Sequence, residues 1–112
     1  ISGVEQVTGA KIKWSVPYTS PGVFNDKSLT DLLVESSKKA IGSNSTIILE
    51  ESSMGGEDFA YYLEHIPGSY YRIGCYDGCA NDVHTPNFDV DESCISTAVL
   101  FLGQAIVDYF NQ

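Results

Sequence analysis

The sequence predicts an α/β fold with a partial sheet, a βαβ unit and a long C-terminal helix. Residues 46–74 run from a short apolar stretch through a glycine-rich turn and a helical segment into a second strand-like stretch. That order is typical of a βαβ unit, in which a right-handed crossover joins parallel strands. After Asp91, apolar residues recur at spacings of three and four, which is the pattern of one long helix.

Length and charge narrow the class of protein. The 112 residues suit about one domain, and 43% of them are hydrophobic, which favours a folded chain over disorder. Fifteen acidic and six basic residues give a net charge of −9, so nucleic acid and anionic membranes are not expected as partners. No run reaches the about 18 consecutive apolar residues of a membrane span. We therefore expect a soluble, cytoplasmic protein, and the start at Ile1 suggests a piece of a longer chain.

The first half of the chain predicts one strand and one helix. Residues 11–16 alternate apolar and polar side chains, as in a half-buried strand. The following residues are rich in proline and glycine, which indicates a boundary near residue 22. A helix is expected at about 28–41, with Ser28 and Asp31 as a variant capping box and Gly42 as its stop.

The second half predicts two further strands and two helices. Residues 46–50 are expected to form a buried strand, and residues 69–74 a second one. Between them a helix is expected at about 57–65, closed by Pro67 and Gly68. The last helix is expected at about 92–110, and acidic residues at its start suit the helix dipole. Its apolar stripe consists of Ile95, Ala98, Val99, Leu102, Ile106 and Tyr109.

Two segments have residues suited to chemistry. In Met54–Ala60, the sequence MGGEDFA, glycines let backbone approach a ligand, and the free N–H groups of a helix start suit a carboxylate or phosphate. The alternative is a tight turn in which Glu57 and Asp58 only complement the helix dipole. His84 precedes Thr85 and Pro86, and proline disfavours helical backbone in the residue before it. His84 is therefore expected on a loop, as a metal ligand or as an ordinary surface residue.

The two segments together resemble the C-terminal part of the metal-dependent amidohydrolases. This family includes aminoacylases, hippurate hydrolases, N-acetyl-diaminopimelate deacetylases and auxin-conjugate hydrolases, with a zinc-peptidase-like, carboxypeptidase-type fold. Its pattern is Met-Gly-(Gly/Ser)-Glu-Asp-Phe, Pro-Gly, a strand-ending Gly, then His-(Ser/Thr)-Pro-x-Phe-Asp-x-Asp-Glu. The matching residues are Met54, Gly55, Gly56, Glu57, Asp58, Phe59, Pro67, Gly68, Gly74, His84, Thr85, Pro86, Phe88, Asp89, Asp91 and Glu92.

The resemblance implies a division of the chain and a reaction. Residues 1–22 would be the end of an inserted α+β lid (dimerisation) domain, and residues 23–112 the C-terminal part of the catalytic domain with its partial sheet. The parent enzyme would hydrolyse the amide bond of an N-acyl amino acid, releasing an amino acid and a carboxylic acid. Two divalent metal ions, which could be zinc, manganese or nickel, would polarise the amide carbonyl and supply hydroxide.

The resemblance also assigns residues. His84 would be the last metal ligand, while the other ligands and the general base belong to a preceding half that this sequence lacks. No catalytic residue is therefore expected here, and the piece alone should be inactive and bind metal weakly or not at all. Gly55, Gly56, Glu57 and Asp58 would contact the substrate or orient a ligand. His65 is interpreted as a helix-end residue.

Two other readings of the sequence stay open. Cys75, Cys79, His84 and Cys94 have the spacing C-x3-C-x4-H-x9-C, which would allow a small Cys3His zinc module. Against it, Cys94 starts the apolar C-terminal helix, where a buried free thiol is commoner. The chain could also be a non-enzymatic interaction domain, because residues 10–16 would offer an exposed strand edge with Trp14 for pairing into a homo-oligomer.

Overall fold

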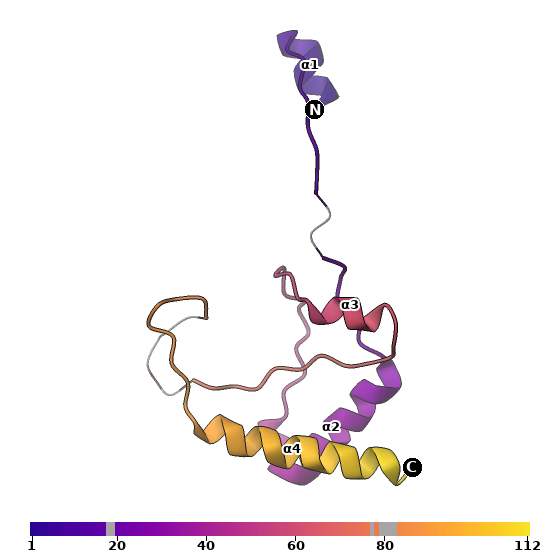
Figure 1. Ribbon diagram of the computed structural model, residues 1–112, viewed down its shortest axis with the longest axis vertical. Coiled ribbons are helices and arrows are strands. Elements are labelled where there is room, and N and C mark those ends of the chain that lie inside the picture. The colour runs from indigo at the N-terminus through magenta and orange to yellow at the C-terminus, as the bar shows by residue number, and fades with distance from the viewer. Residues whose placement is uncertain (18–19, 77, 79–82) are drawn as a thin grey trace.

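The computed structural model describes residues 1–17, 20–76, 78 and 83–112 as a set of helices joined by extended segments (Figure 1). Within those residues no β-strand is formed, so the stretches 11–16, 46–50 and 69–74 have no partner strand and the α/β class stays a prediction. The helices are α1 (Ser2–Thr8), α2 (Lys27–Ile41), the 3₁₀ turn η1 (Ser43–Ser45), α3 (Phe59–Leu63) and α4 (Ser93–Phe110).

The three predicted helices are confirmed in position, although α3 is shorter than expected. Helix α1 is not predicted from the sequence. In the structure, its residues 2–8 have neither a side-chain N-cap nor a buried face. It ends at Gly9, whose φ of 70° is the left-handed conformation that glycine adopts without a steric cost. The boundary near residue 22 stays a prediction.

The chain does not close around one large core. Its radius of gyration is 20.1 Å, whereas a compact domain of this length has about 13 Å. Figure 1 shows why: α1 lies at the end of an extended arm, far from α2, α3 and α4. The packed part is therefore the C-terminal body alone.

Helices α2 and α4 pack against each other and form the best-buried part of this body. Ser36 on α2 is fully buried, and Phe101 and Ala105 on α4 are buried. The Tyr71 ring meets Phe101 edge-on, with centroids 4.8 Å apart and planes at 88°. Edge-to-face geometry is favourable for aromatic pairs. Residue 71, in the extended segment before the hooked loop, is thereby attached to α4.

A polar cluster around Asp108 links the same two helices. The Ser36 hydroxyl donates to Asp108 Oδ2 at 2.7 Å, and Lys39 Nζ lies 3.0 Å from Oδ1. Gln104, one turn earlier on α4, donates to Oδ1 at 3.0 Å. These donors, Ser36 first and Lys39 next, lower the pKa of the Asp108 carboxyl below its ordinary 3.8. Because Ser36 is buried, losing Asp108 would leave a buried hydroxyl without its partner.

Acidification should therefore loosen the α2–α4 pair. The folded pKa of Asp108 is lowered, so its stabilisation is present above about pH 3.8 and is lost as the pH falls through the folded value. The same sign holds for Asp26, Glu57 and Asp91, whose pKa values are also lowered. Circular dichroism at 222 nm should show helix loss as the pH is lowered below the ordinary pKa of 3.8. Asp108→Asn should start less stable and lose less helix on acidification; an equal loss in both proteins would contradict this role.

The start of α2 holds a distant segment of the chain. Its N-cap is Asp26, whose Oδ1 accepts from the Leu29 amide at 2.9 Å, so the predicted capping by Ser28 and Asp31 is wrong. The Asp26 carboxylate, two residues before Ser28, reaches the free Leu29 amide. The Ser28 hydroxyl instead donates to Asp26. The Asp26 amide donates to Gly68 O at 2.8 Å. Residues 68–70 therefore lie against the α2 N-terminus.

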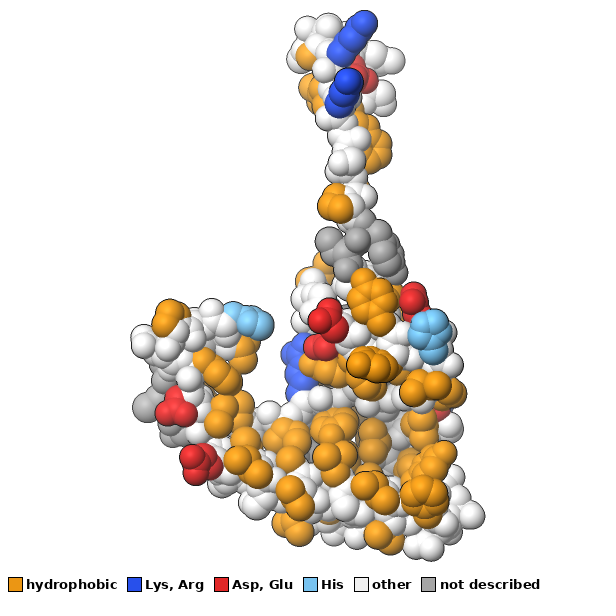
Figure 2. All heavy atoms as spheres, in the orientation of Figure 1, with side chains coloured by type: hydrophobic (Ala, Val, Ile, Leu, Met, Phe, Trp, Pro, Cys, Tyr) orange, Lys and Arg blue, Asp and Glu red, His pale blue; other side chains and the backbone are white. Residues whose placement is uncertain are grey.

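Helix α4 uses a different face from the predicted stripe. The buried Phe101 and Ala105 face α2, while Ile95, Val99 and Ile106 are exposed. Figure 2 shows such orange side chains spread over the lower part of the molecule. The spacing of apolar residues does not predict which face is buried, because α4 is apolar almost all round. Among the described residues, α4 is the one helix that is long enough and apolar enough to cross a membrane, with a mean hydropathy of 1.4. Only 11% of this span is buried within the chain, and the bonds from Ser36 and Lys39 to Asp108 attach one of its faces to α2.

Candidate functional site

The glycine turn before α3 is tightly folded. The Gly55 amide donates to Ser53 Oγ at 3.2 Å. A Cβ on Gly56 would lie 3.1 Å from Ser20 Oγ, closer than nine in ten real Cβ contacts. Glycine at 56 therefore allows residue 20 to approach the turn, whereas the Met54 side chain beside it is fully exposed. The turn in front of α3 thus brings together the four predicted residues, which are neighbours in sequence, and Ser20 lies close to it. These residues are Gly55, Gly56, Glu57 and Asp58.

Glu57 bonds to its own chain. Its Oε1 accepts from the Phe59 amide at 3.2 Å, at the start of α3. This bond, then one from the Tyr70 side chain, and the positive charge of Arg72 lower the pKa of the Glu57 carboxyl. The carboxylate is therefore ionised near neutral pH and directed at the helix start. The Asp58 backbone carbonyl accepts from the Tyr61 amide at 3.1 Å, and its side chain is exposed.

Tyr70 is fixed from two sides. The Asn25 side chain pairs with its backbone: Asn25 Oδ1 accepts from Tyr70 N at 2.8 Å, and Asn25 Nδ2 donates to Tyr70 O at 3.0 Å. The Tyr70 ring lies 5.8 Å from the Phe59 ring. The sequence predicts Tyr70 only as part of the 69–74 strand, and Asn25 lies in the turn-rich segment before α2. The Asn25 side chain bonds to the Tyr70 backbone as a neighbouring strand would, and no periodic pattern in the sequence predicts such a contact.

His84 lies on a hooked loop at the side of the molecule. Figure 1 shows residues 83–91 curving away from the body, apart from α3. His84 is exposed and has a φ of 66°, left-handed backbone that is uncommon outside glycine but enriched in histidine. The Asp91 amide donates to Cys75 O at 3.0 Å, which closes the base of the hook. The Ser93 side chain and amide bond to Asp91 and lower the pKa of its carboxyl, at the start of α4.

The described part of the chain has no cluster that could hold a metal by itself. No three His, Cys, Asp or Glu side chains converge there, so His84 and the acidic residues of the glycine turn do not form a common metal-binding group. Cys75 and Cys94 are free and half-buried. Cys79, the other thiol of the possible Cys3His module, lies outside the described residues. A metal does not fit these residues alone, so no catalytic step can be built on them.

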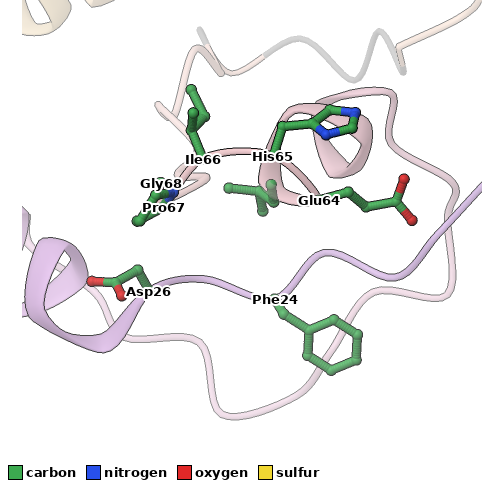
Figure 3. Close-up of a pocket in the computed structure, with 8 residues that line it drawn as sticks. Phe24, Asp26, Glu64, His65, Ile66, Pro67 and Gly68 are labelled. Atoms are coloured by element: carbon green, nitrogen blue, oxygen red, sulfur yellow. The ribbon is translucent and has the colours of Figure 1, made fainter.

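The other histidine borders a shallow depression of about 330 Å³ beside the α2 start. In Figure 3, Phe24 and Asp26 lie on the opposite side of this depression from His65, and the His65 ring points away from them. Asp26 is occupied in capping α2. His65 follows α3 directly, and its amide donates to Tyr62 O at 3.0 Å. The depression is thus bordered by a carboxylate that caps α2 and by a histidine whose ring points away from that carboxylate.

Comparison with known proteins places this geometry in a family. A "Probable hydrolase" of Synechocystis is 37% identical over 98% of this chain and 29% of its own length. An "N-acetyl-L-cysteine deacetylase" of Bacillus subtilis is 44% identical over 86% of this chain and 21% of its own. An "N-acetyldiaminopimelate deacetylase" of Exiguobacterium sibiricum is 28% identical over 97% and 28%. No solved structure matches with significance.

These relatives are much longer than the chain, which spans less than a third of each. The match is nevertheless continuous through the glycine turn, the hooked loop and most of α4. The profile of Peptidase family M20/M25/M40 aligns with residues 3–108, nearly the whole sequence. The resemblance predicted from the MGGEDF and HTPNFDVDE segments is thus confirmed. The chain belongs to Peptidase family M20/M25/M40.

Proposed function

We propose that the chain is the C-terminal portion of a metal-dependent amidohydrolase that cleaves the amide bond of N-acyl amino acids. The observation that carries this proposal is the family match over residues 3–108. Two relatives are named for removing acetyl groups from N-acetyl-L-cysteine and N-acetyldiaminopimelate, so N-acetyl amino acids are the substrate class to try first. The short share of each relative that the chain spans supports a partial catalytic domain.

His84 is the residue proposed to reach the metals, together with ligands outside this chain. Support comes from its place in the family motif and on an exposed loop, where the ring is accessible to another part of the protein. A bound pair of metals would polarise the amide carbonyl and lower the pKa of water. Gly55 and Gly56 are proposed to line the substrate side, because they have no side chains of their own and both are exposed.

Separate assays of the chain and its parent test the function. The full coding sequence should yield a protein that hydrolyses N-acetyl-L-cysteine with zinc or manganese, measured by release of the free amine. The 112-residue chain under the same conditions should release none, because about three protein ligands are needed to hold a catalytic metal. Hydrolysis by the short chain would contradict the partial-domain proposal, and no hydrolysis of any N-acyl amino acid by the parent would refute the activity.

We also propose self-association through residues 10–16. Ile12, Trp14 and Val16 alternate along this segment and all are exposed, Trp14 to 64%. The Ile12 amide donates to Glu5 at 2.8 Å, and an extended segment with apolar side chains and no partner strand can pair with a second copy. Sedimentation at high concentration should show a dimer, and Trp14→Asp should shift it to monomer. Phe24→Asp removes an aromatic that is even more exposed, at 84%, but lies outside the segment, and should leave the dimer. A monomeric wild type would contradict the proposal.

A further inference from the structure

Glu57 is occupied by groups of its own chain, which narrows its role. Its Oε1 accepts from the Phe59 amide at 3.2 Å. The Tyr70 ring lies 5.8 Å from the Phe59 ring, and hydrogen bonding by the Tyr70 side chain and the charge of Arg72 both lower the pKa of Glu57. A carboxylate held in this way by its own chain has a fixed orientation, which suits a role in shaping the turn. The family motif alone leaves this choice open.

The support for Glu57 leads back to the best-packed element. Asn25 forms two hydrogen bonds with the backbone of Tyr70, and the next residue, Asp26, bonds to Gly68 and caps α2. Thr30 on α2 adds a hydroxyl contact of 2.9 Å with Ser69. Tyr70 is therefore anchored on both sides of its peptide before its ring and hydroxyl reach α3. Contacts therefore run from the start of α2 to the 68–70 segment, and from Tyr70 to Glu57.

We infer that Tyr70, held by Asn25, is a positioning residue that fixes the Glu57 carboxylate and with it the Gly55–Gly56 turn. The turn ends at Gly56, directly before Glu57, and Ser20 leaves it little room. With Glu57 attached both to the α3 start and to the 68–70 segment, the turn cannot swing as a free glycine loop. The consequence for substrate rests on the proposed function, in which this turn lines the substrate side.

Four single variants test the inference. Tyr70→Phe removes only the hydroxyl, and Glu57→Ala removes the carboxylate. Glu57→Gln keeps an acceptor oxygen for the Phe59 amide and an amide group for the Tyr70 oxygen. Tyr62→Phe is the matched control, because its ring lies 6.0 Å from Phe59, much as Tyr70 does, while its side chain is exposed.

The first measurement needs no activity. Hydrogen exchange of the Phe59 amide in the 112-residue chain should speed up about fivefold in Glu57→Ala and in Tyr70→Phe, the effect of losing one ordinary hydrogen bond. Glu57→Gln and Tyr62→Phe should exchange like wild type. Equal exchange in Tyr70→Phe and Tyr62→Phe would overturn the role of Tyr70, whatever the parent enzyme hydrolyses.

The second measurement uses the full-length parent with N-acetyl-L-cysteine as probe. Glu57→Ala and Tyr70→Phe should raise KM about fivefold while kcat stays within about twofold, since only the position of the turn changes. Glu57→Gln should restore KM. A large loss of kcat and of bound metal in Glu57→Gln would show Glu57 acting on the metals, and would overturn the inference. A wild-type parent without hydrolysis would refute the proposed function alone, because the exchange result would still decide on Tyr70.

Discussion

Replacing His84 in the full-length parent should remove metal and hydrolysis together. Loss of one protein ligand from a catalytic site that needs about three is expected to lower activity by about 100-fold or more. His84 has left-handed backbone with a φ of 66°, so the variant matters. His84→Asn keeps a residue that tolerates this conformation, whereas His84→Ala adds a strain of about 1 kcal/mol or more. Metal content by emission spectrometry and amine release should fall in both variants.

The second histidine provides the control for this experiment. His65 lies just beyond α3 and is exposed, so His65→Ala should keep metal and activity near wild type. If His84→Asn retained full activity and only His84→Ala lost it, the residue would serve the turn instead of the metal. If both retained activity, the ligand assignment would be refuted. The measurement therefore separates backbone conformation from coordination.

Phe101→Ala should be the most destabilising substitution in the chain. The side chain is 6% exposed and carries the edge contact to Tyr71, and removing a buried phenylalanine costs about 3 to 5 kcal/mol. A whole domain is stable by only about 5 to 15 kcal/mol, and the described core here is small. We expect the α2–α4 pair to separate, with a loss of helical signal at 222 nm at temperatures where the wild type is folded.

A matched phenylalanine on the same helix gives the comparison. Phe110 is 79% exposed, so Phe110→Ala makes the same chemical change without opening a cavity. It should leave the thermal midpoint within a few degrees of wild type. Equal midpoints for Phe101→Ala and Phe110→Ala would mean that α4 is not held through the Phe101 contact.

Sequence patterns predicted the helices well because local rules decide them. Helix α2 has the expected leucine spacing and ends at Gly42, whose φ is 88°, and α4 has an uninterrupted apolar repeat. The face that α4 buries was not predictable, since residues on every side of it are apolar and the choice depends on Ser36 and Asp108. The α/β class depends on pairing between distant strands, which no local rule fixes. Residues 46–50 lie extended without such pairing in the described chain.

The candidate site divides in the same way. His84 and the glycine turn were found from sequence because they belong to short contiguous motifs. The support of Glu57 was missed, since Tyr70 beside it and Asn25, which bonds to the Tyr70 backbone, come from positions with ordinary strand and turn composition. A side-chain amide bonded to a distant backbone depends on the fold, and the spacing of residues gives no sign of it.

The exposed segment after η1 has a practical consequence for handling the chain. Ile47, Ile48 and Leu49 are exposed to 80%, 71% and 66%, in an extended stretch with no proline and little charge. Short segments of this composition stack into fibrillar cross-β assemblies when they stay uncovered. Overproduced alone, part of the chain should accumulate in inclusion bodies, and Ile48→Lys should raise the share in the supernatant.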